Sequence, residues 1–416
     1  MALEPAASWL IAFLVVIALS LTARINVGWL AIAFAGIVGV GWGSLKPAAV
    51  LGSFPASLFV TLLGVTLLFG VAEKNGALAV GTTVFVRAFG GVAALLPPAF
   101  FLLAAIVSAA GPGAVAATAL VAPLAMTAGA AARVPPVLMA LLVANGANAG
   151  SLSPFSAVGV IVQTQFVKAG IPIEGWRVFL PNFVAHTIMA ALAYLFFGGL
   201  KLSRQRAEIA AGEAVTFGRA QIVTIVVTVA WIGAVVLGWA DLGLAAFVAA
   251  SLLILVGAVD DAAATKAVPW SVLVMVCGVS LLVEIGQRMG GLRLFTTGLA
   301  QLATPGSVNG VMAFVTGLVS TYSSTSGVVY PAFLPMVPGL IGELGGGDPV
   351  AVGLSINVGA ALVDVSPLST LGALCIAAGV ARGADGKAMF RTLLLWGFAM
   401  TLVGAVFCQL FIGWFV

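Results

Sequence analysis

Apolar stretches of about twenty residues recur along the whole of this sequence, and they decide what it can fold into. Hydrophobic residues make up 62% of its 416 residues and charged residues only 7%, whereas a soluble domain carries about 25% charged residues. A disordered chain needs the opposite balance, low hydrophobicity and high charge. We therefore predict an all-α polytopic membrane protein.

The polar and cysteine residues exclude several other classes of protein. The 17 Lys and Arg residues, against 13 Asp and Glu, are too few for a nucleic-acid-binding surface. The single histidine excludes a metal site of several histidines, and the three cysteines lie in apolar stretches without metal-ligand spacing. The sequence has no G-x-x-x-x-G-K-S/T loop for nucleotide phosphates. We therefore expect no enzyme, no organic cofactor and no nucleic-acid partner.

Glycine, proline and charged residues divide the apolar sequence into predicted membrane spans. Two stretches, 92–131 and 309–342, are each long enough for a hairpin of two half-length helices. Weakly amphipathic segments at 76–90 and 290–303 are predicted to lie at the membrane interface. The ten predicted spans are 8–23, 27–44, 52–72, 135–168, 178–200, 221–239, 243–259, 269–286, 350–380 and 392–415.

The distribution of basic residues predicts the orientation of these spans. With ten crossings and an external N-terminus, most of the 17 Lys and Arg residues fall on the cytoplasmic side, in agreement with the positive-inside rule. No basic residue precedes the first apolar run, so we expect a membrane segment there and not a cleavable signal. The prediction is a multi-pass protein of the inner (plasma) membrane with both termini outside.

The two halves of the sequence resemble each other at a nearly constant offset. The strongest match aligns Ser151–Gly159 (SLSPFSAVG) with Asp364–Gly372 (DVSPLSTLG), 213 residues later. Each half contains five predicted crossings, an odd number, so the second half must enter the membrane from the opposite face. Such inverted repeats are common in secondary transporters. We predict a first repeat at 1–200, a cytoplasmic linker at 201–220 and a second repeat at 221–416.

A Ser-Pro pair interrupts one apolar span in each half, at Ser153-Pro154 and at Ser366-Pro367. Proline breaks a helix interior, but it suits the first position of a new helix with serine as the N-cap. We therefore expect Ser153 and Ser366 to cap the second half-helices of two broken spans, 135–168 and 350–380. The alternative is that each pair merely kinks a continuous helix. Polar residues accompany both breaks: Asn145, Asn148, Ser151 and Ser156 in one, and Asn357, Asp364, Ser369 and Thr370 in the other.

Each predicted hairpin contains a further break, at Gly111–Gly113 in the first half and at Thr321–Gly327 in the second. If the four breaks meet near the midplane, four half-helix N-termini point into one cavity. Each offers free N–H groups and about half a positive charge, so the cavity attracts an anion without an arginine or a lysine. Unwound carbonyl groups beside them suit a small cation.

Asp364 is the only carboxylate that the predicted spans place deep in the membrane. An intramembrane carboxylate is costly and indicates a functional role by default. It could ligate sodium, take up a proton, or form a structural hydrogen bond at the break. Its counterpart in the first half is the neutral Ser151, so any coupling chemistry differs between the halves.

Four stretches carry a resemblance to a known family: Asn26–Gly36 (NVGWLAIAFAG), Phe54–Leu62 (FPASLFVTL), Gly111–Ala116 (GPGAVA) and Gly150–Ser156 (GSLSPFS). Residues from about 26 to 170 resemble the N-terminal domain of the malonate/dicarboxylate carrier family, within the ion-transporter superfamily of divalent anion/sodium symporters. The resemblance implies a homodimer in which a transport domain moves against a scaffold domain as an elevator. It also implies a small di- or tricarboxylate substrate, usually carried with sodium.

The same resemblance implies where the substrate and the sodium ion bind. The symporters have a Ser-Asn-Thr motif at each hairpin tip; here Thr325–Gly327 is a partial match, whereas Gly113–Val115 has no polar side chain. The Ser-Pro pairs stand where the family has Thr-Pro beside the substrate carboxylates. Thr321 and Ser326 fall on positions that contribute sodium ligands in the family. One cation site, and not two, is therefore expected, at Thr321, Ser326, Asp364 and Val365.

We expect a secondary active transporter of a small dicarboxylate, malonate-like or a C4 acid, coupled to Na⁺ or H⁺. The alternatives are a membrane subunit of an importer that needs a soluble binding protein, and a cation-independent anion exchanger. The expected partners are the organic anion, the lipid bilayer and a second copy of the chain. The expected substrate-binding residues are Gly113, Ala114, Asn148, Ser151, Ser153, Pro154, Ser156, Thr325, Ser326, Ser366, Pro367 and Ser369.

Overall fold

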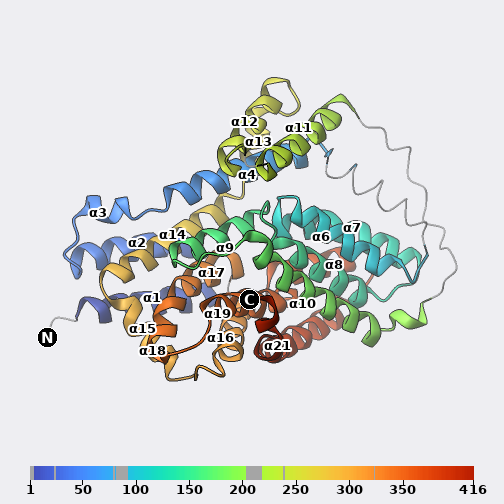
Figure 1. The fold of residues 1–416 in the computed structure, drawn as a ribbon. Coiled ribbons are helices and arrows are strands. Elements are labelled where there is room, and N and C mark those ends of the chain that lie inside the picture. The colour runs from blue at the N-terminus through green and yellow to red at the C-terminus, as the bar shows by residue number, and fades with distance from the viewer. Residues whose placement is uncertain are drawn as a thin grey trace.

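The computed structural model describes residues 4–22, 25–77, 80, 92–202, 218–237, 239–322 and 324–416. Every element in these ranges is a helix (Figure 1), so the predicted all-α class is confirmed. Most of the predicted interfacial segment at 76–90 and of the predicted linker at 201–220 lies outside the described residues.

The helices follow the predicted spans closely, and the breaks fall inside the same stretches. The first half contains α1 Pro5–Thr22, α2 Val27–Gly41, α3 Pro47–Gly52, α4 Ala56–Lys74, α6 Leu96–Ala109, α7 Gly113–Ala131, α8 Pro136–Ser151, α9 Ala157–Lys168, α10 Gly175–Phe196 and η1 Gly199–Lys201. The second half contains α11 Arg219–Val236, α12 Leu242–Leu255, α13 Asp261–Ala267, α14 Trp270–Arg288, α15 Gly291–Ala300, α16 Val308–Tyr322, η2 Thr325–Val329, α17 Tyr330–Phe333, η3 Leu334–Met336, α18 Val337–Leu344, α19 Pro349–Leu362, η4 Val363–Val365, α20 Thr370–Val380, α21 Gly386–Phe411 and η5 Ile412–Phe415.

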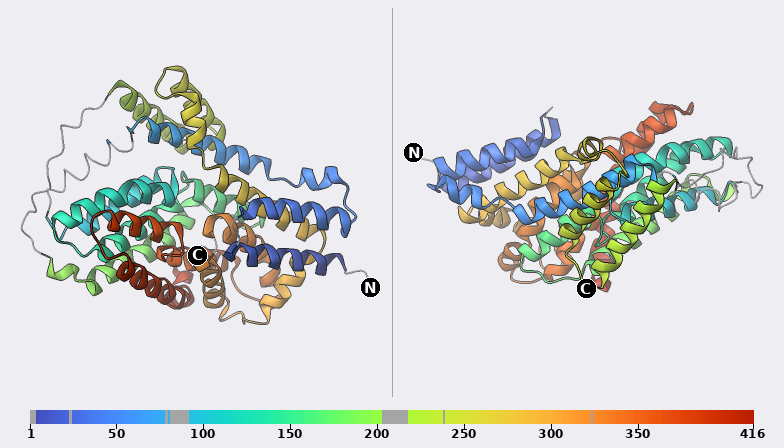
Figure 2. Two further views of the ribbon diagram at one scale, coloured as in Figure 1. Left: turned by 180° about the vertical axis from the view of Figure 1, so that it is seen from behind. Right: turned by 90° about the horizontal axis from the view of Figure 1, so that it is seen from above.

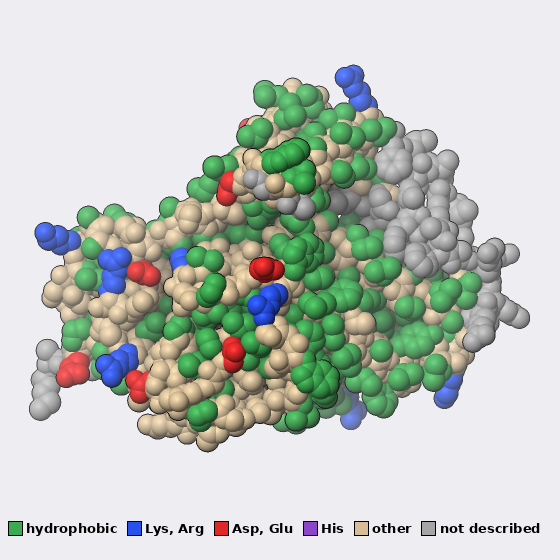
Figure 3. Space-filling model, in the orientation of Figure 1, with side chains coloured by type: hydrophobic (Ala, Val, Ile, Leu, Met, Phe, Trp, Pro, Cys, Tyr) green, Lys and Arg blue, Asp and Glu red, His purple; other side chains and the backbone are tan. Residues whose placement is uncertain are grey.

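Several helices are long and apolar enough to cross a membrane. Among the described residues there are seven such segments, and α2, α6, α12 and α16 are among the shorter apolar helices. Hydrophobic side chains cover much of the face in Figure 3, where charged side chains are few. These features are those of a multi-pass membrane protein, whose outer surface contacts lipid.

The helices form two groups. The α2–α14 group comprises α1–α4 and α11–α15. In this group helices of the first half pack on helices of the second half, since α2 packs on α14 and α4 packs on α12. Both contacts are backbone against backbone: a Cβ on Gly28 would lie 2.3 Å from the carbonyl oxygen of Val274, and one on Gly64 would lie 2.4 Å from that of Gly243. Figures 1 and 2 show α1, α2, α14 and α15 together at one end of the molecule.

The α8–α19 group comprises α6–α10 and α16–α21, with their short η segments. Here α8 packs on α6 and α19 packs on α16. A Cβ on Gly146 would lie 2.2 Å from the carbonyl oxygen of Phe101, and one on Gly359 would lie 2.5 Å from Cα of Ala313. Small residues let apolar helices approach this closely in a membrane. The two groups meet where α4 contacts α9, where α14 contacts η2 and α17, and where α15 contacts α18.

Candidate functional site

The two Ser-Pro breaks have the same geometry, but the caps are not the predicted ones. The second half-helices α9 and α20 begin after Ser156 and Ser369, whose side chains accept from the N–H groups of Val158 and Leu371. The expectation that Ser153 and Ser366 are the N-caps is therefore wrong. A residue before proline avoids the helical region, so the chain makes one turn after the Ser-Pro pair before the next helix starts.

Ser153 and Ser366 stabilise that turn instead. Ser153 Oγ accepts from the Phe155 N–H at 3.2 Å and donates to the Ala109 carbonyl at 2.8 Å, and Ser366 Oγ accepts from the Leu368 N–H at 3.3 Å. The turn also needs a glycine six residues after the first serine. A Cβ on Gly159 would lie 1.9 Å from the Ser153 carbonyl oxygen, and one on Gly372 would lie 2.2 Å from that of Ser366.

The tip of the first hairpin is built from backbone alone. Gly111 and Gly113, at φ of +152° and +79°, reverse the chain between α6 and α7, a conformation that favours glycine. The Gly111 carbonyl accepts from the Ala157 N–H at 3.0 Å, which ties the hairpin tip to the start of α9. A side chain at Gly111 would collide with the ring of Phe69 on α4.

The tip of the second hairpin is built from hydroxyl groups and a carboxylate. Ser324 Oγ accepts from the Gly327 N–H at 3.1 Å, and Thr325 Oγ1 donates to Asp364 Oδ1 at 2.6 Å. Ser320 Oγ is hydrogen-bonded to Thr325 Oγ1. Because the Thr325 proton is given to the carboxylate, Ser320 is the donor of that second bond. Ser369 Oγ donates to the main-chain carbonyl of Asp364.

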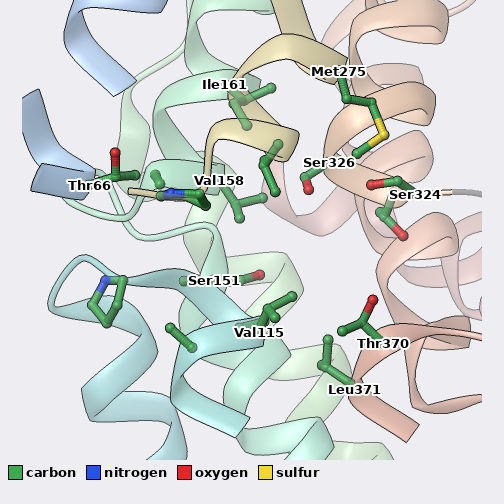
Figure 4. A pocket seen from close by; sticks show the side chains of 18 of the residues that line it. Thr66, Val115, Ser151, Val158, Ile161, Met275, Ser324, Ser326, Thr370 and Leu371 are labelled. Carbon is green, nitrogen blue, oxygen red and sulfur yellow. The ribbon is translucent and has the colours of Figure 1, made fainter. Parts of the chain in front are cut away.

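These four breaks surround one cavity of about 440 Å³. The first residues of α7, α9, η2 and α20 all line it, so two helix starts from each half face the same space. Figure 4 shows Ser151 from α8 facing this space together with Ser324, Ser326 and Thr370 from the second half. Among the described residues that line it, two are charged, Asp364 and Glu73, and both are acidic. An anion there would be held by N–H groups and hydroxyls.

A chain of amides holds the two broken helices together beside the cavity. Asn148 Nδ2 on α8 donates to the Ala361 carbonyl on α19 at 3.1 Å, and Asn182 Nδ2 on α10 donates to the Asn148 carbonyl at 2.8 Å. The ring of His186 on α10 is bonded to Asn145 Oδ1 at 3.0 Å through Nδ1. The Asn148 main-chain carbonyl also accepts from Ser151 Oγ at 2.8 Å, and the bond to Ala361 uses one of the two hydrogens of the Asn148 side-chain NH₂ group.

The cavity brings together many of the residues expected at the substrate and cation sites, and leaves others out. Asp364 and the substrate candidates Gly113, Ala114, Asn148, Ser151, Thr325, Ser326 and Ser369 line it. Ser153, Pro154, Ser156, Thr321, Val365, Ser366 and Pro367 are not among its lining residues. Ser324 and Tyr330 also line it and were not expected; the hydroxyl-rich run from 321 to 326 was the available signal for Ser324, and none pointed to Tyr330.

The oxygen cluster of Ser320, Thr325 and Asp364 has the composition of a site for a small hard cation. Thr321, expected to be a ligand, donates to the Gly317 carbonyl at 3.0 Å within α16 and is not bonded to this cluster. Val365 is fully buried. No group of three or more His, Cys, Asp or Glu side chains that could hold a metal ion occurs in the described part of the chain.

Comparisons with known proteins agree with this geometry. Residues 5–151 match the family profile described as the N-terminus of the dicarboxylate carrier protein MatC. The fold is similar to the crystal structure of the Alcanivorax borkumensis YdaH transporter, with a TM-score of 0.62 and 15% sequence identity over 99% of each chain. Curated protein sequences gave no match. The predicted resemblance to the dicarboxylate carrier family is thus confirmed over residues 5–151; this match is to a carrier and not to an enzyme, and the structural similarity shows a shared fold.

Proposed function

We propose that this protein is a secondary active transporter of a small dicarboxylate, malonate-like or a C4 acid, coupled to Na⁺ or H⁺. The observation that carries the proposal is the cavity where two helix starts from each half meet and where no lysine or arginine lies among the described lining residues. Amide N–H groups at helix starts bind carboxylates without a fixed cationic side chain. The N-terminal match to a dicarboxylate carrier family supports this substrate class.

Cation coupling is supported by the charge of the cavity. The charged side chains that line it in the described part of the chain, Asp364 and Glu73, are acidic, so a dicarboxylate would add negative charge beside them. Entry of a cation or a proton with the substrate removes part of that repulsion. The Ser320–Thr325–Asp364 cluster is the proposed place for it, in preference to Thr321 and Val365.

An elevator movement of two inverted repeats is supported by the way the two helix groups are built. Each group contains helices of both halves, and α2 on α14 repeats the contact of α12 on α4. The equivalent breaks form the same turn, 213 residues apart. We propose that the α8–α19 group moves as the transport domain against the α2–α14 group as scaffold, in a homodimer of the inner membrane.

Purified protein in detergent tests the proposal through a thermal-shift panel of dicarboxylates and sulfonates, each with sodium chloride or choline chloride. We expect a C3 or C4 dicarboxylate to raise the melting temperature, and either sodium or a lower pH to enlarge that shift. Stabilisation by monocarboxylates or sulfonates alone would refute the substrate class. A shift independent of sodium and pH would favour the cation-independent exchanger.

Uptake into liposomes separates the transporter from the subunit of a larger importer. Protein reconstituted alone should accumulate the dicarboxylate identified by thermal shift when an inward sodium or proton gradient is imposed. Uptake that appears only after a soluble binding protein is added would favour the importer. Ser326→Ala, which removes a hydroxyl from the cavity, serves as the variant with reduced affinity.

A further inference from the structure

A second cavity, of about 820 Å³, lies at the boundary between the two helix groups. The C-terminal halves of α9 and α14 line it, with α15 and α18. Unlike the first cavity, it is lined by basic as well as acidic side chains: Lys168, Arg293, Glu284 and Glu343. The proposed substrate site does not include it.

The two cavities follow one another along the same helices. On α9 the first cavity is lined by Ile161 and the second by Gln165, positions one helical turn apart, or about 6 Å along the axis. On α14 the first is lined by Met275 and the second by Ser280. The first cavity extends to Glu73 near the C-terminal end of α4. The second extends to the corresponding end of α14.

A buried hydrogen bond stands between them. Gln165 Nε2 on α9 donates to Ser280 Oγ on α14 at 3.1 Å, and the two residues are only 1% and 4% exposed. Separation of a buried amide and a buried hydroxyl costs the hydrogen bond between them, and more than separation of exposed groups does.

Few polar side-chain contacts join the two helix groups. Between described residues these are the Gln165–Ser280 hydrogen bond, an ion pair between Arg293 and Glu343 at 3.5 Å, and a longer-range charge interaction between Lys168 on α9 and Glu284 on α14. The ion pair is exposed and contributes little. Charge interactions and apolar contacts, such as that of Met275 with Gly327, are non-directional, so they permit sliding. The Gln165–Ser280 bond is therefore the directional link that a relative movement of the groups must break.

We propose that the second cavity is a second access chamber for the binding cavity, and that the Gln165–Ser280 hydrogen bond is the latch that closes it in this conformation. The inference rests on the proposed transport function and adds to it the hydrogen bond that stabilises this conformation. With the latch broken, the boundary opens and the anion site becomes accessible from the α15–α18 side. With it formed, access is from the Glu73 side only.

Cysteine accessibility tests the latch without requiring transport. A cysteine at Ile161, which lines the first cavity one helical turn before Gln165, is reacted with a membrane-impermeant maleimide in right-side-out and inside-out vesicles that contain the full chain. The native cysteines Cys277, Cys375 and Cys408 are buried, and the chain without the new cysteine gives the background. In the parent, labelling is expected from the Glu73 side.

Gln165→Leu and Ser280→Ala should each raise the labelling rate from the α15–α18 side by about fivefold, the population change that loss of one hydrogen bond supports. The double variant should add nothing to either single variant, because both remove the same bond. Gln163→Leu, two residues away on α9 and outside both cavities, is the matched control and should behave as the parent.

Equal labelling in the Gln165, Ser280 and control variants would overturn the latch, and so would additive effects in the double variant. Melting temperatures establish that each variant is folded, and Ser280→Ala, which removes a single oxygen, carries the test if Gln165→Leu is unstable. Dicarboxylate uptake by the parent in liposomes reports separately on the proposed function. If labelling shifts but uptake fails, the transport proposal fails. If uptake occurs but labelling does not shift, the latch fails.

Discussion

The two halves of the binding cavity share their backbone geometry and differ in their chemistry. Each contains a Ser-Pro turn closed by the same hydrogen bonds and the same glycine contact. At the hairpin tips, however, the first half offers only Gly111–Gly113, whereas the second offers hydroxyl groups beside Asp364. The Ser-Pro turn is therefore present whether or not a carboxylate lies beside it. The backbone turn occurs in both halves, whereas the cluster of Ser320, Thr325 and Asp364 occurs in the second half.

The largest effects are expected where the shared turn is blocked. Gly159→Ala and Gly372→Ala each place a Cβ about 2 Å from a backbone oxygen, which no side-chain rotation relieves. We expect each to lower the free energy of unfolding by about 3 kcal/mol or more, or to prevent folding. Thermal unfolding in detergent measures the loss. The control is Gly36→Ala, where nothing lies within 4 Å of the added Cβ; a mild effect at either turn glycine would mean that the turn is not tightly constrained.

The next largest effect is expected where the halves differ in charge. Asp364→Asn should reduce the dependence of dicarboxylate binding on sodium or pH by roughly tenfold or more, because a nearby carboxylate is the strongest cation ligand at the site. Glu73→Gln, the other acidic residue of the cavity, should have a smaller effect because Glu73 lies outside the hydroxyl cluster. Titrations of binding against sodium and against pH measure both. Unchanged dependence in Asp364→Asn would leave this carboxylate a structural role.

Variants of Ser326 and Ser366 compare a residue that lines the cavity with a residue that belongs to the turn. Ser326→Ala removes a hydroxyl from the cavity and should weaken dicarboxylate affinity about fivefold, the value of one hydrogen bond. Ser366 is fully buried outside the cavity, so Ser366→Ala should lower the melting temperature and leave the affinity of the folded protein nearly unchanged. Calorimetric binding and thermal unfolding are both needed. The opposite pattern would place Ser366, and not Ser326, at the substrate.

The smallest effects should come from the helix caps. Ser156→Ala should cost about 1 kcal/mol of stability through the loss of the cap on α9. Ser369→Ala should cost more, since Ser369 Oγ also donates to the Asp364 carbonyl. Unfolding midpoints of the two variants, measured side by side, test the order. Equal losses would mean that the bond to Asp364 adds no stability.

The sequence could predict the breaks because proline and glycine act locally. Pro154 and Pro367 interrupt a helix wherever they occur in one, and the helices end within a few residues of the predicted positions. It could not predict which serine caps the next helix, because the turn after Ser153 is fixed by contacts with Ala109 and Gly159 on other segments. Pattern alone therefore placed the cap three residues too early.

The cluster of Ser320, Thr325 and Asp364 shows the same limit of the sequence. Asp364 was recognisable from the cost of burying a carboxylate, but its partners depend on how α16 ends. Thr321 is turned toward the carbonyl of Gly317, while Ser320 reaches Thr325. Adjacent residues on a helix point about 100° apart, so only the packing of α16 on α19 decides which hydroxyl faces the carboxylate.

The sequence by itself determined that this chain lies in a membrane as helices, that two of them break at a Ser-Pro pair, and that one carboxylate lies at a break, since composition and proline chemistry act without distant partners. Only the tertiary structure decided that four helix starts share one cavity, that Ser153 and Ser366 stay outside it, and that Gln165 meets Ser280 between two cavities. These are contacts between residues far apart in the chain, and they are selected by the close packing of whole helices.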